Sequence, residues 1–205
     1  MAKRWLAFLW LAVLLLAVGC GGGDEAPAAP TGATSEVGSP TPPSERTAVP
    51  TPIITNGRFE DPAKGYSVQI PDGWAAHPNF VPAPLLTDAF FAPNGTEGVQ
   101  PNIAVLCEEL PEGRTLTEHF DAKTEIVRRV AGVEPDVSTR QVGGMEVMVA
   151  SYGRENSNPP LHKTEVVFVS ERCGWSVSLT VPFGQEGEYE PLFERFLASF
   201  TLLPP

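Results

Sequence analysis

Three histidines are the first residues to consider for metal or acid–base chemistry. His77, His119 and His162 lie far apart in the sequence. Metal sites usually show a close pair of ligands, such as two histidines one helical turn apart or a Cys-x-x-Cys pair. The sequence contains no such pair, so we expect no metal centre. His119 falls within a predicted helix, and we expect it to be a solvated surface residue.

The hydroxyl and carboxyl side chains also lack the patterns that would make them catalytic. Ser151 and Ser170 stand outside the glycine-flanked turn that exposes a nucleophilic serine, and no glycine-rich loop opens a helix as phosphate binding requires. Glu108, Glu109 and Glu112 cluster after a strand without the spaced acids of a calcium loop, so we expect a solvated edge. The sequence therefore indicates no catalytic residue and no cofactor, and we predict that the protein is not an enzyme.

Cys20 has the most specific chemistry of the chain. It follows a basic pair, Lys3-Arg4, and a 14-residue apolar run, Trp5–Val18, which is too short to span a bilayer and is typical of a signal peptide. The ending Ala17-Val18-Gly19-Cys20 resembles the bacterial lipobox, with Ala17 where that motif usually has Leu. The resemblance implies cleavage before Cys20 and a diacylglycerol on its thiol. The alternatives are a chance thiol after an ordinary secretory signal and a short uncleaved anchor helix.

Cys107 and Cys173 are the two cysteines that remain once Cys20 is acylated. Outside the cytoplasm an even pair suggests a disulfide, which requires Cα atoms within about 7 Å of each other. The predicted elements place Cys107 in a sheet interior and Cys173 at a hairpin tip. The sequence leaves two outcomes open: a disulfide, or Cys107 as a small buried apolar residue.

Composition divides the chain into three parts. Residues 1–19 form the predicted lipoprotein signal peptide, and residues 20–52 the lipidated cysteine and its tether. The tether lacks aromatic residues and is rich in Pro, Ser and Thr, so it cannot bury enough apolar surface to fold. Residues 53–205 form one predicted domain, long enough for a sizeable core.

The charge balance limits the partners of the protein. The net charge is −11, and the predicted domain carries 21 acidic and 11 basic residues. Binding to nucleic acid requires a basic surface, so we exclude nucleic acid as a partner. The same charge disfavours attraction to an anionic membrane, so the lipid on Cys20 must provide the anchor.

Alternation, turn residues and helical spacing predict an α+β domain with a mostly antiparallel sheet. Thr115 and Glu118 have the form of a capping box, which starts a helix that Gly132 ends. A second helix is predicted from apolar residues at helical spacing between Tyr189 and Phe200. The predicted strands cover residues 65–70, 89–92, 102–108, 138–142, 145–152, 164–170 and 175–181.

The proline-rich stretch Pro78–Pro84 is the best candidate for contact with a partner. It carries the apolar residues Phe80 and Val81 in a segment that we expect to be a loop. The alternative is an ordinary irregular connection.

Several of these elements together resemble the PsbP-like superfamily, which includes bacterial lipoproteins of LpqN type. The resemblance lies in the strand and turn from Gly65 to Trp74, the capped middle helix, the paired strands and the closing Ala198-Ser199-Phe200. It covers roughly residues 56–203 and implies an αβα sandwich around an antiparallel sheet. Members of this superfamily bind or help to assemble other components and share no catalytic constellation.

These observations predict a lipoprotein anchored at the extracytoplasmic face of the cell membrane. Its domain would bind an unknown protein or small molecule, or assist assembly, without catalysis. One alternative is an envelope-associated hydrolase whose site is assembled from acidic residues scattered in the sequence. Another is a purely structural envelope protein.

Overall fold

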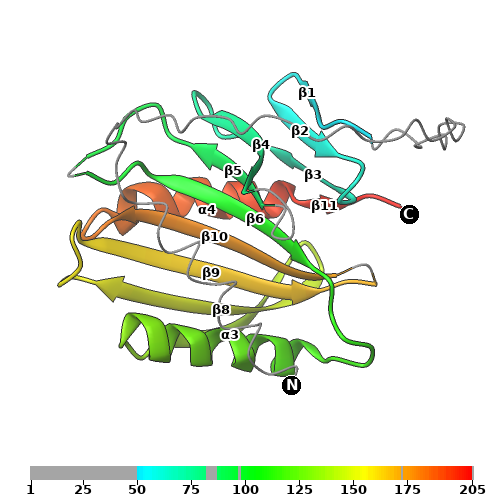
Figure 1. Cartoon of the computed structure of the whole chain (residues 1–205). Helices are drawn as coiled ribbons and strands as arrows, with labels where there is room; N and C mark the ends of the chain where they lie inside the picture. Colours follow the sequence, from blue (N-terminus) through cyan, green and yellow to red (C-terminus); the bar gives the residue numbers. More distant parts are fainter. Residues whose placement is uncertain (1–49, 82–86, 97, 172, 205) are drawn as a thin grey trace, which may run out of the picture.

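A computed structural model describes residues 50–81, 87–96, 98–171 and 173–204. These residues form two antiparallel sheets and two α-helices (Figure 1). The helices are α3 (Leu116–Ala131) and α4 (Glu186–Ser199). The strands are β1 (Ile53–Thr55), β2 (Arg58–Asp61), β3 (Tyr66–Gln69), β4 (Ala75–Val81), β5 (Thr87–Phe91), β6 (Asn102–Glu108), β7 (Asp136–Val142), β8 (Met145–Arg154), β9 (Leu161–Val169), β10 (Gly174–Pro182) and β11 (Thr201–Leu202).

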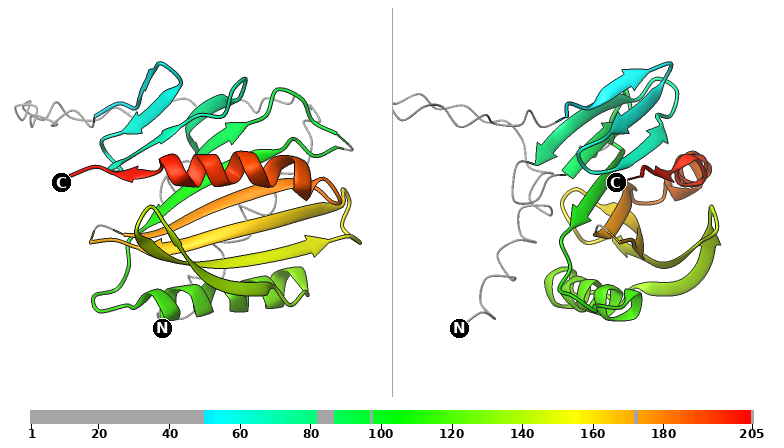
Figure 2. Two further views of the ribbon diagram at one scale, coloured as in Figure 1. Left: turned by 180° about the vertical axis from the view of Figure 1, so that it is seen from behind. Right: turned by 90° about the vertical axis from the view of Figure 1, so that its right-hand side faces the viewer.

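The larger sheet lies between the two helices, as the predicted αβα sandwich requires. Its seven strands have the order β4-β5-β6-β10-β9-β8-β7. On one face Phe120 of α3 contacts Ala150 and Val167, whereas the neighbouring Val149 and Val166 point into the core that α4 covers. Figure 2 shows α3 and α4 on these separate sides. The expected α+β class and sandwich architecture are confirmed.

The smaller sheet, in the order β1-β2-β3-β11, closes the core beside α4. Four aromatic rings meet where this sheet, the larger sheet and the end of α4 converge. Tyr66 stacks on Phe200 with ring centroids 5.2 Å apart, and Trp175 packs edge-on against both rings at 5.4 Å. Phe168 stacks on Trp175 at 5.9 Å. Large buried rings contribute much of the hydrophobic stabilisation of such a core, so this cluster joins the two sheets into one domain.

Local sequence signals placed both helices correctly. The Thr115 hydroxyl accepts from the Glu118 backbone N–H at 3.3 Å, and the Glu118 carboxylate accepts from the Thr115 N–H at 3.0 Å. Gly132 ends α3 with φ of 69°, a left-handed conformation that glycine adopts without steric cost. The helix predicted between Tyr189 and Phe200 corresponds to α4.

The sequence did not predict β1, β2 or β4, and the expected loop at Phe80 and Val81 was wrong. Both residues belong to β4, the outermost strand of the larger sheet. Pro78 cannot donate a ladder hydrogen bond, but an edge strand tolerates it. The register also shifts between His77 and Val81, where Asn79 has φ of 52° and absorbs the irregularity.

Candidate functional site: an aromatic edge on the larger sheet

The sequence-predicted contact residue Phe80 lies in a cluster of three rings at the edge of the larger sheet. His77 and Phe80 come from β4, and Phe91 comes from the end of β5. Their centroids are 5.1 Å apart for Phe80–Phe91, 5.3 Å for His77–Phe91 and 6.2 Å for His77–Phe80, all edge-to-face. We call these three residues the aromatic edge. Phe80 remains 40% exposed and Val81 is half-buried beside it.

A buried charged network fixes the backbone beneath the aromatic edge. The backbone N–H of Asn79 donates to Asp88 Oδ1 at 2.8 Å, and its side-chain Oδ1 accepts from Lys64 Nζ at 2.9 Å. Lys64 Nζ also lies 2.5 Å from Asp88 Oδ1. Asn79 directly precedes Phe80 and holds a left-handed conformation that few residues adopt. The network therefore fixes the irregular part of β4 at the residue directly before Phe80.

Two further groups complete this network. Asp61 lies 3.1 Å from Lys64 Nζ, and Tyr66 donates its hydroxyl hydrogen to Asp88 Oδ2 at 2.5 Å. Burial, followed by the charge of Asp88, raises the pKa of Tyr66 well above its usual value, so it remains a donor at neutral pH. Asp61, Asp88 and Lys64 are all less than 10% exposed. Removing one partner from such a network leaves a buried charge uncompensated, which makes the network sensitive to substitution.

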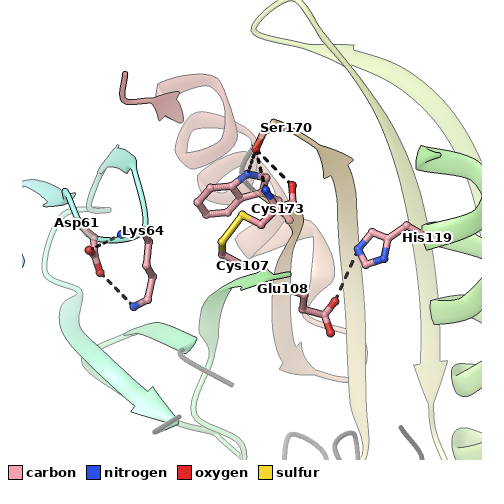
Figure 3. Close-up of a disulfide and its surroundings, with 8 residues drawn as sticks. Asp61, Lys64, Cys107, Glu108, His119, Ser170 and Cys173 are labelled. Carbon is pink, nitrogen blue, oxygen red and sulfur yellow. Dashed lines mark hydrogen bonds and ion pairs between the residues drawn. A yellow bond between two sulfur atoms is a disulfide. The ribbon is translucent and has the colours of Figure 1, made fainter. Parts of the chain in front are cut away.

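Cys107 and Cys173 form a disulfide, with their Cα atoms 5.7 Å apart (Figure 3). The sequence left this pairing open because it could not place β10 next to β6. In the structure these strands are antiparallel neighbours, and Trp175 lies opposite Cys107 in the ladder. The Trp175 indole N–H donates to Ser170 Oγ at 3.0 Å, and the same oxygen accepts from the backbone N–H of Cys173 at 3.4 Å. The disulfide therefore ties the end of β6 to the residue directly before β10.

His119 and Glu108 do not occupy the solvated positions expected for them. His119 is only 4% exposed, on the side of α3 that faces the sheet, and its Nε2 lies 3.7 Å from the half-buried Glu108 carboxylate (Figure 3). Lys123, one helical turn further, is 2.6 Å from the same carboxylate. Burial, then the charge of Lys123, lowers the pKa of His119 to about 4 despite the opposing effect of Glu108. Glu109 and Glu112 are exposed, as expected.

The structure brings together three residues that the sequence did not connect. Ser151 Oγ on β8 lies 2.9 Å from His162 Nε2 on β9, and His162 Nδ1 lies 3.1 Å from Glu186 Oε1 at the start of α4. Sequence spacing gives no signal for this arrangement because the three residues belong to separate elements. One signal was present: Ser151 and His162 are polar at strand positions where alternation otherwise places inward apolar residues such as Val149 and Val166.

Comparison with known proteins gives no match to a family model and none to a curated protein sequence. Solved structures do match. LpqN of Mycobacterium tuberculosis, described as involved in cell envelope biogenesis, has a TM-score of 0.53 at 13% identity over 75% of this chain and 90% of its own. PsbP (CyanoP) of Synechocystis sp. PCC 6803 has a TM-score of 0.52 at 16% identity over 71% and 91%. The fold is PsbP-like. The Ran-binding protein Mog1p of Saccharomyces cerevisiae shares it, with a TM-score of 0.51 at 12% identity over 74% and 97%.

Three sequence-based predictions remain: the lipid anchor with its tether, the absence of a metal centre, and the absence of a membrane-spanning helix. Cys20, the signal peptide and nearly all of the tether lie outside the described residues. Within the ranges that the structure describes, no group of three or more His, Cys, Asp or Glu side chains could hold a metal ion. In the same ranges, no helix has the length and apolar character needed to cross a membrane.

Proposed function

We propose that the protein is a lipoprotein anchored through Cys20 at the extracytoplasmic face of the cell membrane. Its PsbP-like domain binds a component of the envelope, or assists its assembly, and binding rather than turnover of a substrate is its main role. The observation that carries this proposal is the aromatic edge. It places exposed side chains on β4, and the buried network of Lys64 and Asp88 fixes the backbone of that strand.

Rigidity makes the aromatic edge suited to binding. A contact patch that is already ordered loses little conformational entropy when a partner docks. Phe80 offers an exposed ring, while the ion pair of Lys64 with Asp88 and the hydrogen bonds of Asn79 hold the strand beneath it. Aromatic residues are enriched at the energetic centres of interfaces. We infer a partner with an apolar contact surface, either a protein or a small molecule.

Two observations support the extracytoplasmic location. The Cys107–Cys173 disulfide is a bond that persists in oxidising compartments and is rare in the cytoplasm. LpqN, which has the same fold, is described as a protein of cell envelope biogenesis. Both agree with the signal peptide and lipobox that the sequence predicts.

The alternative of an envelope hydrolase built from scattered acids has no comparable support in the described residues. Such a site needs two converging carboxylates that remain free for acid and base roles. Asp61 and Asp88 converge on the same lysine, but both are buried and paired with Lys64 Nζ, at 3.1 and 2.5 Å.

The test compares the aromatic edge with an equally apolar control site. The tagged full chain is cross-linked in intact cells, purified from membranes, and its co-purifying components are quantified by mass spectrometry. Phe80→Ala should reduce recovery of a specific component about tenfold or more, because truncating a central aromatic contact costs roughly 2 kcal/mol. Ile54→Ala, at an exposed site on β1 (54% exposed), should leave recovery unchanged.

Two results would contradict the proposal. One is the absence of any component enriched above a lipoprotein that carries the same Cys20 anchor and an unrelated domain. The other is equal recovery with Phe80→Ala and with Ile54→Ala.

A further inference from the structure

Ser151, His162 and Glu186 converge on the α4-covered face of the larger sheet, away from the aromatic edge. Ser151 is half-buried on β8, and His162 is half-buried on the neighbouring β9. Glu186 is the first residue of α4 and reaches back to the imidazole. Ser151 Oγ lies at hydrogen-bond distance from His162 Nε2, 2.9 Å, and the other ring nitrogen, Nδ1, lies 3.1 Å from Glu186 Oε1, an ion-pair distance.

The carboxylate of Glu186 is held ionised. Partial burial opposes ionisation, but the backbone N–H groups of Gly184 and of Glu186 itself, together with His162, outweigh burial and lower the pKa of Glu186. The Gly184 N–H donates to the same Oε1 atom at 3.0 Å. This carboxylate is fixed by the turn before α4 and can act only as an acceptor.

An acceptor at Glu186 determines the tautomer of a neutral His162. With a carboxylate 3.1 Å from Nδ1, the favoured tautomer carries its hydrogen on Nδ1, so Nε2 keeps its lone pair and can accept only. The Ser151 hydroxyl therefore donates to Nε2. A serine hydroxyl hydrogen-bonded to an imidazole base, which is itself oriented by a carboxylate, is the arrangement that activates serine for attack on carbonyl carbon.

The surroundings of Ser151 indicate what could bind there. Residues 151 and 153 share a face of β8, and Gly153 lies opposite His162 in the ladder. A Cβ atom on Gly153 would come 2.5 Å from the ring of Phe183, so this ring covers the same face beside the imidazole. The Phe183 ring is 38% exposed and offers an apolar wall to an incoming group. Asp136 is the strand partner of Ser151 on β7, so an acidic residue flanks the serine and disfavours anionic substrates.

We propose that Ser151, His162 and Glu186 form a nucleophile–base–carboxylate array that transfers the acyl group of activated, uncharged carboxylic esters to Ser151 and then to water. This activity goes beyond the proposed binding role and does not depend on it. Ser151 and His162 are the catalytic residues, and Glu186 is a positioning residue.

The reaction proceeds in two balanced halves. Ser151 Oγ forms a bond to the ester carbonyl carbon while its proton passes to His162 Nε2. The tetrahedral intermediate expels the alcohol, which takes that proton, and leaves an acyl ester on Ser151. Water then attacks the acyl ester with His162 accepting its proton, and the carboxylic acid is released as Ser151 Oγ recovers a proton. Oxyanion donors usually supply the largest share of catalysis in acyl transfer, so we confine the proposal to esters with good leaving groups.

The experiment combines covalent labelling with ester turnover, using the full-length chain solubilised from membranes. A fluorophosphonate probe should label Ser151, as located by peptide mapping, and 4-nitrophenyl acetate should be hydrolysed. Ser151→Ala should abolish both, and His162→Gln should slow both by roughly 100-fold, the usual contribution of a general base. Ser138→Ala, at an exposed serine on the neighbouring strand β7, should change neither.

The role of Glu186 has its own readouts. Glu186→Gln should slow labelling about tenfold or more, and combining it with His162→Gln should slow labelling no further than His162→Gln alone, because the residues act as one unit. Wild type should also show a downfield proton resonance from the His162 Nδ1–H that is lost in Glu186→Gln. Thermal unfolding of each variant identifies any loss that comes from misfolding.

Three results would overturn the proposal in variants that unfold at the wild-type temperature. They are labelling of wild type no faster than of Ser151→Ala, equal rates for wild type and Glu186→Gln, and additive effects of His162→Gln and Glu186→Gln. None of these would affect the binding role, which the Phe80→Ala comparison tests separately.

Discussion

The Tyr66 hydroxyl is a single group on which the buried network under the aromatic edge depends. It donates to Asp88 Oδ2, and Tyr66→Phe would remove this donor while keeping the ring in its stack. A buried acceptor deprived of a partner costs about 1–3 kcal/mol. We therefore expect Tyr66→Phe to lower the free energy of unfolding in urea by this amount. Tyr189→Phe, on the half-buried flank of α4, is the matched control and should have little effect; equal losses in both variants would argue against the network.

His119 makes stability depend on pH at the residue scale. Its pKa is about 4 in the folded protein, against 6.5 for an unperturbed histidine. Between these values the unfolded chain binds a proton that the folded chain does not, so the free energy of unfolding falls as pH drops through this window, by about 2–3 kcal/mol. Urea unfolding across this range should show a steeper loss for wild type than for His119→Gln. Identical pH dependence in the two proteins would exclude His119 as the cause.

Residue-scale predictions from sequence failed where burial depended on a partner from another element. His119 was expected on the surface, although it lies three residues after Leu116 and one before Phe120, on the edge of the predicted apolar stripe. The helical spacing alone could have placed it against the sheet. The Glu108 carboxylate beside His119 comes from β6, and no local pattern connects these two residues.

At the scale of elements, the contribution of the α3 capping box to the free energy of unfolding can be measured directly. Thr115→Ala would remove the hydroxyl that accepts from the Glu118 N–H, and loss of an N-terminal cap costs about 0.5–2 kcal/mol. We expect urea unfolding to show this loss, whereas Thr117→Ala, also exposed but inside the first turn, should change stability by less than about 0.5 kcal/mol. Equal effects from the two substitutions would mean that the box contributes nothing.

Elements with local signals were predicted well, and those defined by distant pairing were not. Thr115, Glu118 and Gly132 mark both ends of α3, and Gly143-Gly144 joins β7 to β8 as a tight hairpin turn. By contrast β4 contains Pro78 and a left-handed Asn79, features typical of a loop, and it is a strand only because β5 and a buried lysine hold it. The sequence therefore singled out Phe80 and Val81 as contact residues but assigned them to the wrong kind of element, and it did not connect His77 or Phe91 with them.

At the scale of the whole molecule, the sequence predicted an α+β domain and its resemblance to the PsbP-like superfamily implied the αβα architecture, but neither predicted the second sheet. Strands β1, β2 and β11 are short, and β11 pairs with β3 from the opposite end of the chain. Pairing over such a distance leaves no periodic signal. It matters for function because Asp61, Lys64 and Tyr66, at the β2–β3 hairpin of the small sheet, reach across to fix the edge of the large one.

The central claim is that a lipid on Cys20 anchors this PsbP-like domain outside the cytoplasm. The most direct measurement is cell fractionation of the full-length chain and of Cys20→Ala, with a membrane-impermeant protease added to intact cells or spheroplasts to report the side of the membrane. We predict that wild type sediments with membranes and is cleaved from outside. Cys20→Ala should appear in the soluble extracytoplasmic fraction. Retention of Cys20→Ala on the membrane, or protection of the wild-type domain from the protease, would contradict the account.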